Sequence, residues 1–338
     1  MTSTRRSSVN LAFVHMHARM LAARDRVASS GAVRAMSRAT ALSIALSSDR
    51  RRRRSRRVRA AFTLIIGVVL LIGASCRLRA QEWRTVDVAR QRVDSSGAGI
   101  KVRFGVGSLL LAAITGPYLY HMQLRYDASR AEPRSSWDAA SRTATLGMTS
   151  NGMRWASGRN TEAANMVLGL SSASPLDLSI ELGATESTLD LTGLWLRSLD
   201  VRSGASATRI RFTTPSVHPI ERIEIETGVA QFTVEQLANS GARIVRVRGG
   251  LSLVELDLTG SWQRDMALEL DLSLGRGELT VPKALGVRVT TERASSMLSV
   301  EGLKKVGDAW ESDGFATAER KLAVSVHSSI GALSITRR

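Results

Sequence analysis

The chain has 338 residues, of which 43% are hydrophobic and 4% aromatic, and its formal net charge is +17. The charge is uneven: residues 1–80 hold 17 Arg and 2 acidic residues, whereas the remainder holds 30 basic and 28 acidic residues. This nearly neutral body argues against a nucleic-acid-binding fold that is basic over its whole surface. The only cysteine is Cys76, so no disulfide can form within the chain and packing alone must hold it together.

Residues 1–59 form a basic arm with no β pattern and no recognisable core. If translation begins at Met36 or Val58, the residues before that start are not part of the protein. A dense arginine block runs from Arg50 to Arg59. Such a block can bind DNA or RNA, but the export signal that adjoins it explains it better. We therefore expect a disordered arm and no nucleic-acid partner.

An uncharged apolar run from Ala60 to Ser75 follows the arginine block directly. A positive segment followed by an apolar one is the pattern that export machinery recognises. Because positive charge resists translocation, the arginines should stay in the cytoplasm while the rest of the chain crosses. We predict that residues 60–80 form a signal peptide or a transmembrane anchor helix, and that the body is exported to the cell envelope, in the periplasm or on the cell surface.

Three fates of this segment are open. Leu78-Arg79-Ala80 resembles a cleavage site, which would leave Gln81 as the first residue. Gly73-Ala74-Ser75-Cys76 resembles the site at which a diacylglyceryl group is attached to a cysteine. Without cleavage, or with the lipid, residues 60–76 would hold the protein at the membrane. A buried helix in a soluble domain is less favoured, because no helical partner is encoded nearby.

Residues 83–170 predict a less regular β region that caps one end of the fold. Apolar residues around Gly105 and Gly107 indicate a divergent first repeat unit, and strands are expected near 86–88, 119–126, 145–148 and 165–170. The segment 131–141 contains Pro133 and many polar residues, so we expect a loop there.

Residues 171–338 repeat a strand–glycine–strand unit in which apolar and polar residues alternate, as in strands with one buried face. Glycines separated by 21, 24, 22 and 25 residues mark successive units at Gly183, Gly204, Gly228, Gly250 and Gly275. Weaker units surround Ala294 and Ser329. Glycine is expected at these turns because it reaches positive φ without a clash.

Three positions of each unit are aliphatic in all five cases, namely those five and three residues before the glycine and six residues after it. They are Leu178, Ile180, Leu189, Leu199, Val201, Ile210, Ile223, Ile225, Val234, Val245, Val247, Leu256, Leu270, Leu272 and Val281. This regularity predicts an all-β solenoid or β-roll in which successive coils of about 21–25 residues stack and share one core.

An antiparallel meander would show the same alternation, but one detail favours stacking. Glu181, Arg202, Glu226 and Arg248 stand two residues before the glycines, on the outward face, and their charge alternates from unit to unit. In stacked coils these residues would be direct neighbours about 4.8 Å apart, where opposite charges attract. In a meander an intervening strand would separate them.

The sequence offers little for catalysis. His121, His218 and His327 have no cysteine or second histidine at metal-ligand spacing, and no phosphate-binding or nucleotide-binding motif is present. We therefore predict no catalytic, cofactor-binding or metal-binding residues. The outward carboxylates Glu221, Glu224, Glu226, Glu255 and Asp257 are expected to form a solvated charged face. Their alternative role, with scattered tryptophans, would be in a glycan-acting β-solenoid enzyme.

The segments Leu176–Ala184, Leu199–Arg211 and Val281–Val287 resemble the toast-rack family, which is related to cell-wall-active-antibiotic-response proteins and adhesin domains. The resemblance is best over residues 165–338. It implies a right-handed β-roll in the cell envelope and no active site. We therefore expect an exported, non-catalytic binding module or scaffold, adhesin-like or part of an envelope stress response. Its partner would be an envelope protein or a polysaccharide, which the sequence does not identify.

Overall fold

The structure is a computed structural model that describes residues 82–150, 163–292, 297–328 and 332–338. The predicted arm 1–59, the signal or anchor segment 60–80, and the residues Cys76, Ala80 and Gln81 lie outside this part. In the part of the chain that the structure describes, no helix has the length and apolar character needed to span a bilayer.

Residues 82–338 form one compact unit that is built almost entirely of strands. The described elements are β1 (Trp83–Gln91), β2 (Ala98–Ile114), β3 (Tyr118–Asp127), β4 (Ala131–Asp138), β5 (Thr143–Ser150), β6 (Asn165–Ser171), β7 (Leu176–Asp190), β8 (Leu196–Ser203), β9 (Ala207–Arg211), β10 (Arg222–Glu235), η1 (Leu237–Ser240), β11 (Ile244–Asp257), β12 (Met266–Val281), β13 (Gly286–Glu292), β14 (Met297–Val300), β15 (Leu303–Val306), β16 (Ala309–Ser312), β17 (Lys321–Ser328) and β18 (Ala332–Arg337).

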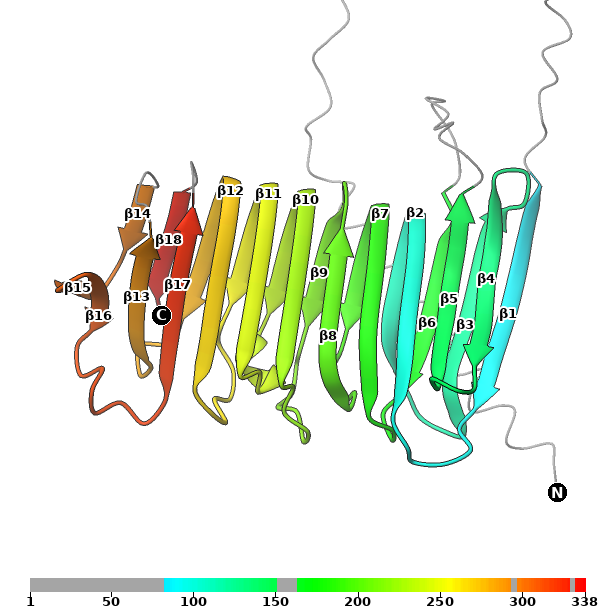
Figure 1. Ribbon diagram of the computed structural model, residues 1–338, viewed down its shortest axis with the longest axis horizontal. Coiled ribbons are helices and arrows are strands. Elements are labelled where there is room, and N and C mark those ends of the chain that lie inside the picture. The colour runs from blue at the N-terminus through cyan, green and yellow to red at the C-terminus, as the bar shows by residue number, and fades with distance from the viewer. Residues whose placement is uncertain (1–81, 151–162, 293–296, 329–331) are drawn as a thin grey trace, which may run out of the picture. The chain divides into compact units, whose positions relative to one another are not determined.

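Each coil is a strand that bends in the middle, so that its two halves pair in different layers. The first half of β10 pairs with β8 and its second half pairs with β9, and both pairings are parallel. We call the layer of first halves sheet A and the layer of second halves sheet B. Figure 1 shows the coils side by side, with the bends along one long edge and the return loops along the other.

The two layers have matching orders. Sheet A runs β4-β5-β2-β7-β8-β10-β11-β12-β17-β13-β16-β15, and sheet B runs β1-β3-β6-β2-β7-β9-β10-β11-β12-β18-β14. From β5 and β6 to β13 and β14 the neighbouring coils are parallel, which confirms stacked coils and rejects the meander. A two-residue hairpin cannot join parallel neighbours, so each coil returns through a loop.

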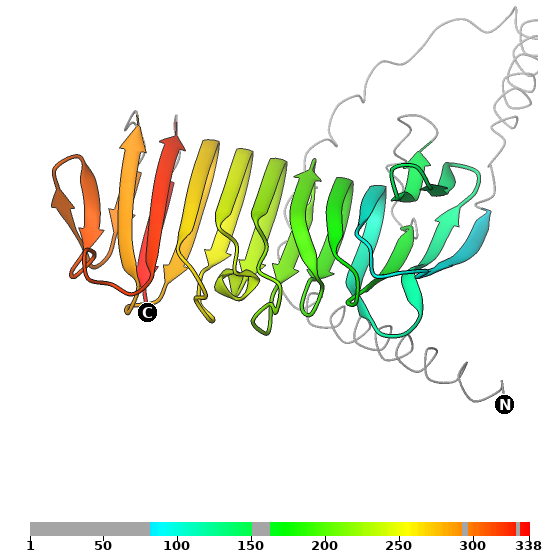
Figure 2. The same ribbon diagram turned by 60° about the horizontal axis from the view of Figure 1, so that its bottom comes forward.

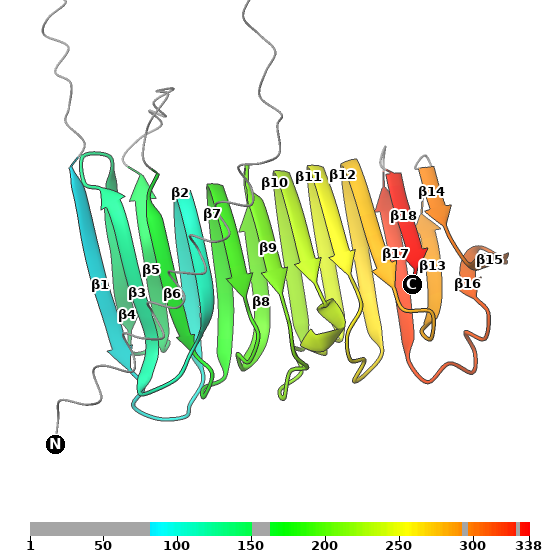
Figure 3. The same cartoon turned by 180° about the vertical axis from the view of Figure 1, so that it is seen from behind.

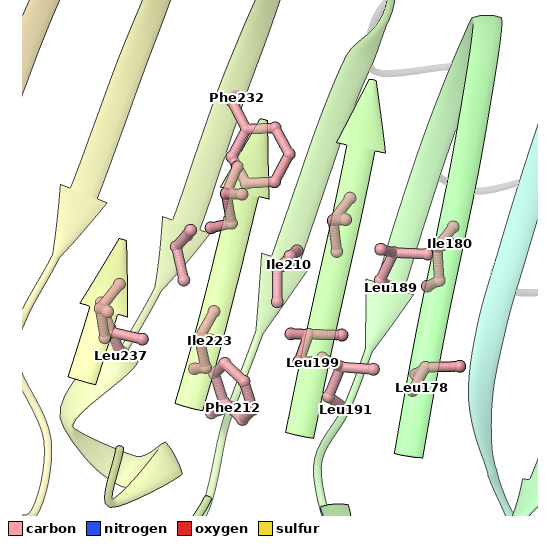
Figure 4. Close-up of a cluster of buried hydrophobic side chains, with 14 of the residues drawn as sticks. Leu178, Ile180, Leu189, Leu191, Leu199, Ile210, Phe212, Ile223, Phe232 and Leu237 are labelled. Carbon is pink, nitrogen blue, oxygen red and sulfur yellow. The ribbon is translucent and has the colours of Figure 1, made fainter. Parts of the chain in front are cut away.

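The core lies between the two sheets. All fifteen aliphatic positions of the repeat are buried, with exposed fractions of 3% or less. In the close-up of Figure 4, Leu178 and Ile180 of β7 and Leu189 of the same strand's second half project into a common interior. Phe212 and Phe232, which are also buried, extend this interior. Because the pattern has period two, burial of one residue in two is what fixes the register of each coil.

The glycines at the bends serve a purpose other than the one we expected. None of the five predicted turn glycines has a positive φ. Instead, the coils approach too closely for a side chain: a Cβ on Gly183 would lie 2.2 Å from the carbonyl oxygen of Gly105. A Cβ on Gly228 or Gly250 would lie 3.0 Å from the carbonyl oxygen one coil away. Close backbone contact, rather than backbone conformation, therefore accounts for this glycine row.

One of the predicted repeat units is out of register. Val245 pairs with Leu268 and Leu256 pairs with Leu279, so the coil that follows β11 is displaced by 23 residues and not by 25. The equivalent of Gly250 is therefore Ser273, and Gly275 pairs with Ser252. The predicted core positions stayed correct because a shift of two residues keeps every side chain on the same face.

The stack does not follow the chain order at either end. The last coil, β17 and β18, lies between β12 and the pair β13 and β14 (Figure 1, and Figure 3 from behind). At the other end, β2 lies between β7 and the pair β5 and β6. Sequence spacing cannot show this, because the alternating pattern is the same in any order of the coils.

Antiparallel strands close both ends of the stack. β4 pairs with β5 in sheet A and β3 pairs with β6 in sheet B, and the hairpin of β15 and β16 lies against β13 at the far end (Figure 2). The predicted loop at 131–141 was wrong, because residues 131–138 form β4. Pro133 is tolerated there because β4 is the edge strand of sheet A, and proline suits edge strands.

Candidate functional site

The outward face of sheet A carries a row of alternating charges that runs along the stack just before the bends. We call it the upper charged row, and it consists of Arg103, Glu181, Arg202, Glu226, Arg248 and Asp271. Each member lies directly opposite the next in the parallel register. The predicted alternation of four residues therefore holds and extends by one coil in each direction.

Ion pairs connect many of these neighbours. Arg103 Nε lies 3.0 Å from Glu181 Oε2, and Arg202 Nε lies 3.4 Å from Glu226 Oε2. Arg248 Nη1 donates a hydrogen bond of 3.3 Å to the other oxygen of Glu226. These side chains are about half exposed, so each pair contributes little to stability, about 0.2–1 kcal/mol. The paired strands, rather than these ion pairs, set the spacing of the charged groups along the row.

A lower charged row runs parallel to the first, two residues earlier in each coil. It consists of Lys101, Ser179, Asp200, Glu224, Arg246 and Glu269. Arg246 donates hydrogen bonds of 2.6 Å to Glu269 and 3.4 Å to Glu224. Asp200 lies opposite Glu224. Its partial burial, and then the negative charges of Glu224 and its neighbours, raise the pKa of Asp200 above the usual carboxyl value, although Arg202 opposes the shift.

Two depressions lie on this face of sheet A. The larger, an open groove of about 900 Å³, follows the upper charged row and the glycine row, so that its floor is backbone and one side is charged. The smaller, of about 460 Å³, includes Asp177, Arg197, Asp200 and Glu224. Absence of side chains at the bend glycines is what hollows the surface beside the charges.

An aliphatic row lies on the other side of the glycines, at the first residue of each second half. Its members are Val106, Ala184, Ala205, Val229, Leu251 and Leu274, which the pairing and the hydrogen bonds at the bends place in line. Val229, Leu251 and Leu274 are 61%, 60% and 50% exposed. Sequence reasoning missed this row. The signal available was an apolar residue directly after the bend, out of phase with the buried positions.

The outward acids that we singled out do not form one cluster. Glu224 and Glu226 are on sheet A, whereas Glu255 and Asp257 belong to β11's half in sheet B. Glu221 precedes β10 and pairs with Arg243 and Arg264, and the hydrogen bond from Arg243 lowers the pKa of Glu221.

The histidines are also far apart. In the cap, His121 Nε2 lies 2.7 Å from Asp87 Oδ1. In the return loops, the ring of His218 stacks on the ring of Trp195, with the two centroids 3.8 Å apart. His327 lies opposite Asp271 in the pairing of β12 and β17. In the described ranges, no group of three or more His, Cys, Asp or Glu side chains has the arrangement of a metal site.

The described tryptophans do not line either depression on the face of sheet A. The guanidinium carbon of Arg125 lies 4.5 Å from the centroid of the Trp83 ring. That of Arg90 lies 4.1 Å from the centroid of the Trp137 ring. Trp137, Trp262 and Trp310 are partly buried against the core. Trp155 lies outside the described residues. Of the described tryptophans, most therefore close the ends or edges of the core.

This geometry defines the class of the protein: a two-sheet β-roll with a charged, shallowly grooved face. Residues 80–235 match the family model described as the N-terminal domain of toast_rack, DUF2154. This match supports a toast-rack-like family for residues 80–235, in agreement with the resemblance in sequence. The matched range begins earlier than the region in which the resemblance was strongest, and the two overlap over residues 165–235. None of the curated proteins matches the sequence.

Solved structures give looser similarity. A presumed cell adhesion protein from Clostridium sporogenes is 15% identical, with a TM-score of 0.39, and the match covers 76% of this chain and all of that one. Presumed adhesins from Bacteroides fragilis and Parabacteroides distasonis are 9% and 11% identical, with TM-scores of 0.38 and 0.37. Those matches cover 76% of this chain and 98% of each of the others. With TM-scores below 0.5, these similarities leave the function of the chain open.

Proposed function

We propose that this protein is an exported, envelope-associated binding module, an adhesin-like or stress-response scaffold, and that it acts through the outward face of sheet A without catalysis. The observation that supports this best is the pair of charged rows, which the register of the stacked strands spaces regularly along one face. Positions fixed in this way need little ordering when a partner binds, which lowers the entropic cost of association.

The chemistry of the face favours a protein partner over a polysaccharide. Alternating charges at about 4.8 Å spacing are best matched by a surface that offers the opposite charges, and such complementarity gives specificity. Sugar rings would be held by stacking on exposed aromatic rings. Neither depression on this face has a tryptophan or tyrosine in its lining.

One observation supports the alternative, a glycan-acting enzyme. Asp200 and Glu224 are adjacent carboxylates, and the raised pKa of Asp200 is the property expected of a general acid. Release of reducing sugar from envelope polysaccharide by the wild type, and its loss in Asp200→Asn, would establish this alternative and contradict the binding module. The ion pairs of Glu224 with Arg222 and Arg246, at 3.5 Å and 3.4 Å, favour a structural role.

Export follows from the order of charge and apolar residues in 50–80, and one experiment addresses it. Cells that produce the full chain are fractionated, and the mature N-terminus is determined by mass spectrometry. An envelope protein that begins at Gln81, carries a diacylglyceryl group on Cys76, or keeps residues 60–76 as an anchor would support the proposal. A full-length protein in the cytoplasmic fraction would contradict it.

A further inference from the structure

We propose that two copies of this chain associate along the bends of their coils, with their stacks antiparallel, through the aliphatic row and the upper charged row. This partner goes beyond the proposed function and does not depend on it. The starting observation is the exposure of Val229, Leu251 and Leu274 in adjacent coils. Contiguous exposed apolar side chains beside polar ones are typical of interaction sites.

The charges make the row complementary to itself. The upper charged row alternates through an even number of members, so a two-fold axis between Arg202 and Glu226, perpendicular to the stack, brings every cation opposite an anion. Arg202 then faces Glu226 of the second copy, Glu181 faces Arg248, and Arg103 faces Asp271. A two-fold axis along the stack would instead bring Glu226 against Glu226, which like-charge repulsion disfavours. The charges therefore select the antiparallel arrangement.

The aliphatic row is complementary in size under the same axis. Ala205 faces Val229 of the second copy, Ala184 faces Leu251, and the partly buried Val106 faces Leu274. Each large, exposed side chain thus meets a small or recessed one. The glycine row between the two sets removes side chains that would keep the backbones apart. Isologous contacts, in which a surface binds itself, are the commonest form of dimer.

The lower charged row confines the contact to the bends. If the whole face of sheet A were buried under this symmetry, Asp200 would face Glu224 of the second copy. Two carboxylates face to face repel, and the burial would raise their cost further. The proposed dimer therefore leaves the lower charged row exposed and accessible to another partner.

The contact is small. Six positions at about 4.8 Å spacing give a row roughly 24 Å long. Two narrow rows of that length bury less surface than the about 1,200–2,000 Å² that a stable interface buries. We therefore expect a weak dimer in dilute solution. Attachment of both copies to one membrane would favour it, since tethering raises the effective concentration into the mM range.

Site-specific disulfide formation tests the arrangement in the full chain. Cys76 is kept, since it is a possible site of membrane attachment, and Ala184→Cys and Leu251→Cys are introduced in separate copies that carry different tags and are produced in the same cells. Whole cells are treated with an oxidant and analysed without reductant, and copies with Cys76 alone give the background. In the proposed dimer these two positions face each other, whereas each lies about three coils, roughly 14 Å, from its own equivalent. We expect the mixed dimer to exceed either single-variant dimer at least fivefold.

Leu274→Asp should lower the yield of the mixed dimer at least threefold, because it places a charge in the aliphatic row. The matched control is Val217→Asp, the same kind of change at a valine that is 87% exposed in a return loop, and it should leave the yield unchanged. Labelling with a maleimide confirms that both thiols react. Equal yields of mixed and single-variant dimers, or no mixed dimer from reactive thiols, would overturn the proposal.

Discussion

Arg202 and Glu226 lie directly opposite each other on the parallel strands β8 and β10, with Nε of the arginine 3.4 Å from Oε2 of the glutamate. The other oxygen of Glu226 accepts a hydrogen bond from Arg248 on β11. One carboxylate therefore bridges three successive coils. Because the neighbouring strands are parallel, residues at the same place in successive repeat units lie opposite each other, and this explains why the sign of the charge alternates along the sequence.

Reversal of the central charge should destabilise the stack. Glu226→Arg replaces two attractive neighbours by two repulsive ones, so we expect a loss of about 1 kcal/mol in the free energy of unfolding. For a domain of this size that corresponds to a fall of roughly 2–4 °C in melting temperature. Thermal unfolding monitored by circular dichroism at low ionic strength measures it, and added salt should reduce the difference.

A matched rescue distinguishes the charge row from local damage. Adding Arg202→Glu and Arg248→Glu to Glu226→Arg moves the repulsion outward, to Glu181 and Asp271, so it should restore little. Adding Glu181→Arg and Asp271→Arg as well leaves one like-charge pair in the row, at positions 103 and 181, in place of two, and should recover about half of the loss. If the threefold variant were as stable as the fivefold one, charge alternation would not be the cause.

The glycine row predicts a contrast between two similar substitutions. Gly183→Ala should destabilise the protein by about 1–3 kcal/mol, because its Cβ would lie 2.2 Å from the carbonyl oxygen of Gly105 and the backbone would have to move. Gly204→Ala should cost less, since a Cβ there would lie 3.3 Å from the carbonyl oxygen of Gly183, and a shift of a few tenths of an ångström would relieve the contact. Chemical denaturation of both variants measures the difference, and equal losses would contradict the packing role of Gly183.

Two threonines inside the bend predict opposite effects of the same change. Thr227 is buried, and its hydroxyl has no hydrogen-bond partner in the described part of the chain, so Thr227→Val should raise the melting temperature by a few degrees. Thr208 contacts the hydroxyl of Ser206 at 3.1 Å, and Thr208→Val should lower the melting temperature. Thermal unfolding of the two variants tests this. A lower melting temperature in both variants would show that the Thr227 hydroxyl is not an unsatisfied buried group.

Two aspartates predict opposite responses to pH. The raised pKa of Asp200 means that the folded protein binds this proton more tightly than the unfolded chain, so ionisation at neutral pH opposes folding. Asp200→Asn should therefore be more stable than the wild type at pH 7, and the advantage should disappear as the pH falls through the raised pKa toward the unfolded value.

Asp94 is the control of opposite sign. The hydrogen bond from Arg142 lowers the pKa of Asp94, so its contribution to stability is present above the unfolded carboxyl pKa and is lost as the pH falls. Asp94→Asn should be less stable than the wild type at pH 7 and indistinguishable from it in strong acid. Melting temperatures measured from pH 2 to pH 7 test both variants together.

The repeat was predictable from the sequence because burial alternates with period two. Positions such as Leu199 and Val247 could be assigned to the core without knowing how the coils are ordered. That order was not predictable, because strands β17 and β18 carry the same pattern wherever they insert. The two-residue error at Gly275 has the same origin, since parity alone does not distinguish Ser273 from Gly275.

The candidate site was predictable only in part. The alternation of charge from Glu181 to Arg248 indicated the upper charged row. The same register places Asp200 opposite Glu224, but the charges of the lower row do not alternate regularly, so they gave no signal in the sequence. The role of the glycines was misjudged because the sequence cannot separate a positive φ from a close backbone approach. The structure separates them at Gly183, where the neighbouring carbonyl leaves no room.

Photocrosslinking in living cells tests the proposed binding face most directly. A photoreactive amino acid is placed at Ser179, on the outward face of sheet A, or at Thr188, on the outward face of sheet B in the same strand β7. We predict that Ser179 crosslinks to a defined envelope protein and that Thr188 does not. Equal crosslinking from both positions, or crosslinks to cytoplasmic proteins alone, would contradict the proposal that the outward face of sheet A binds an envelope protein.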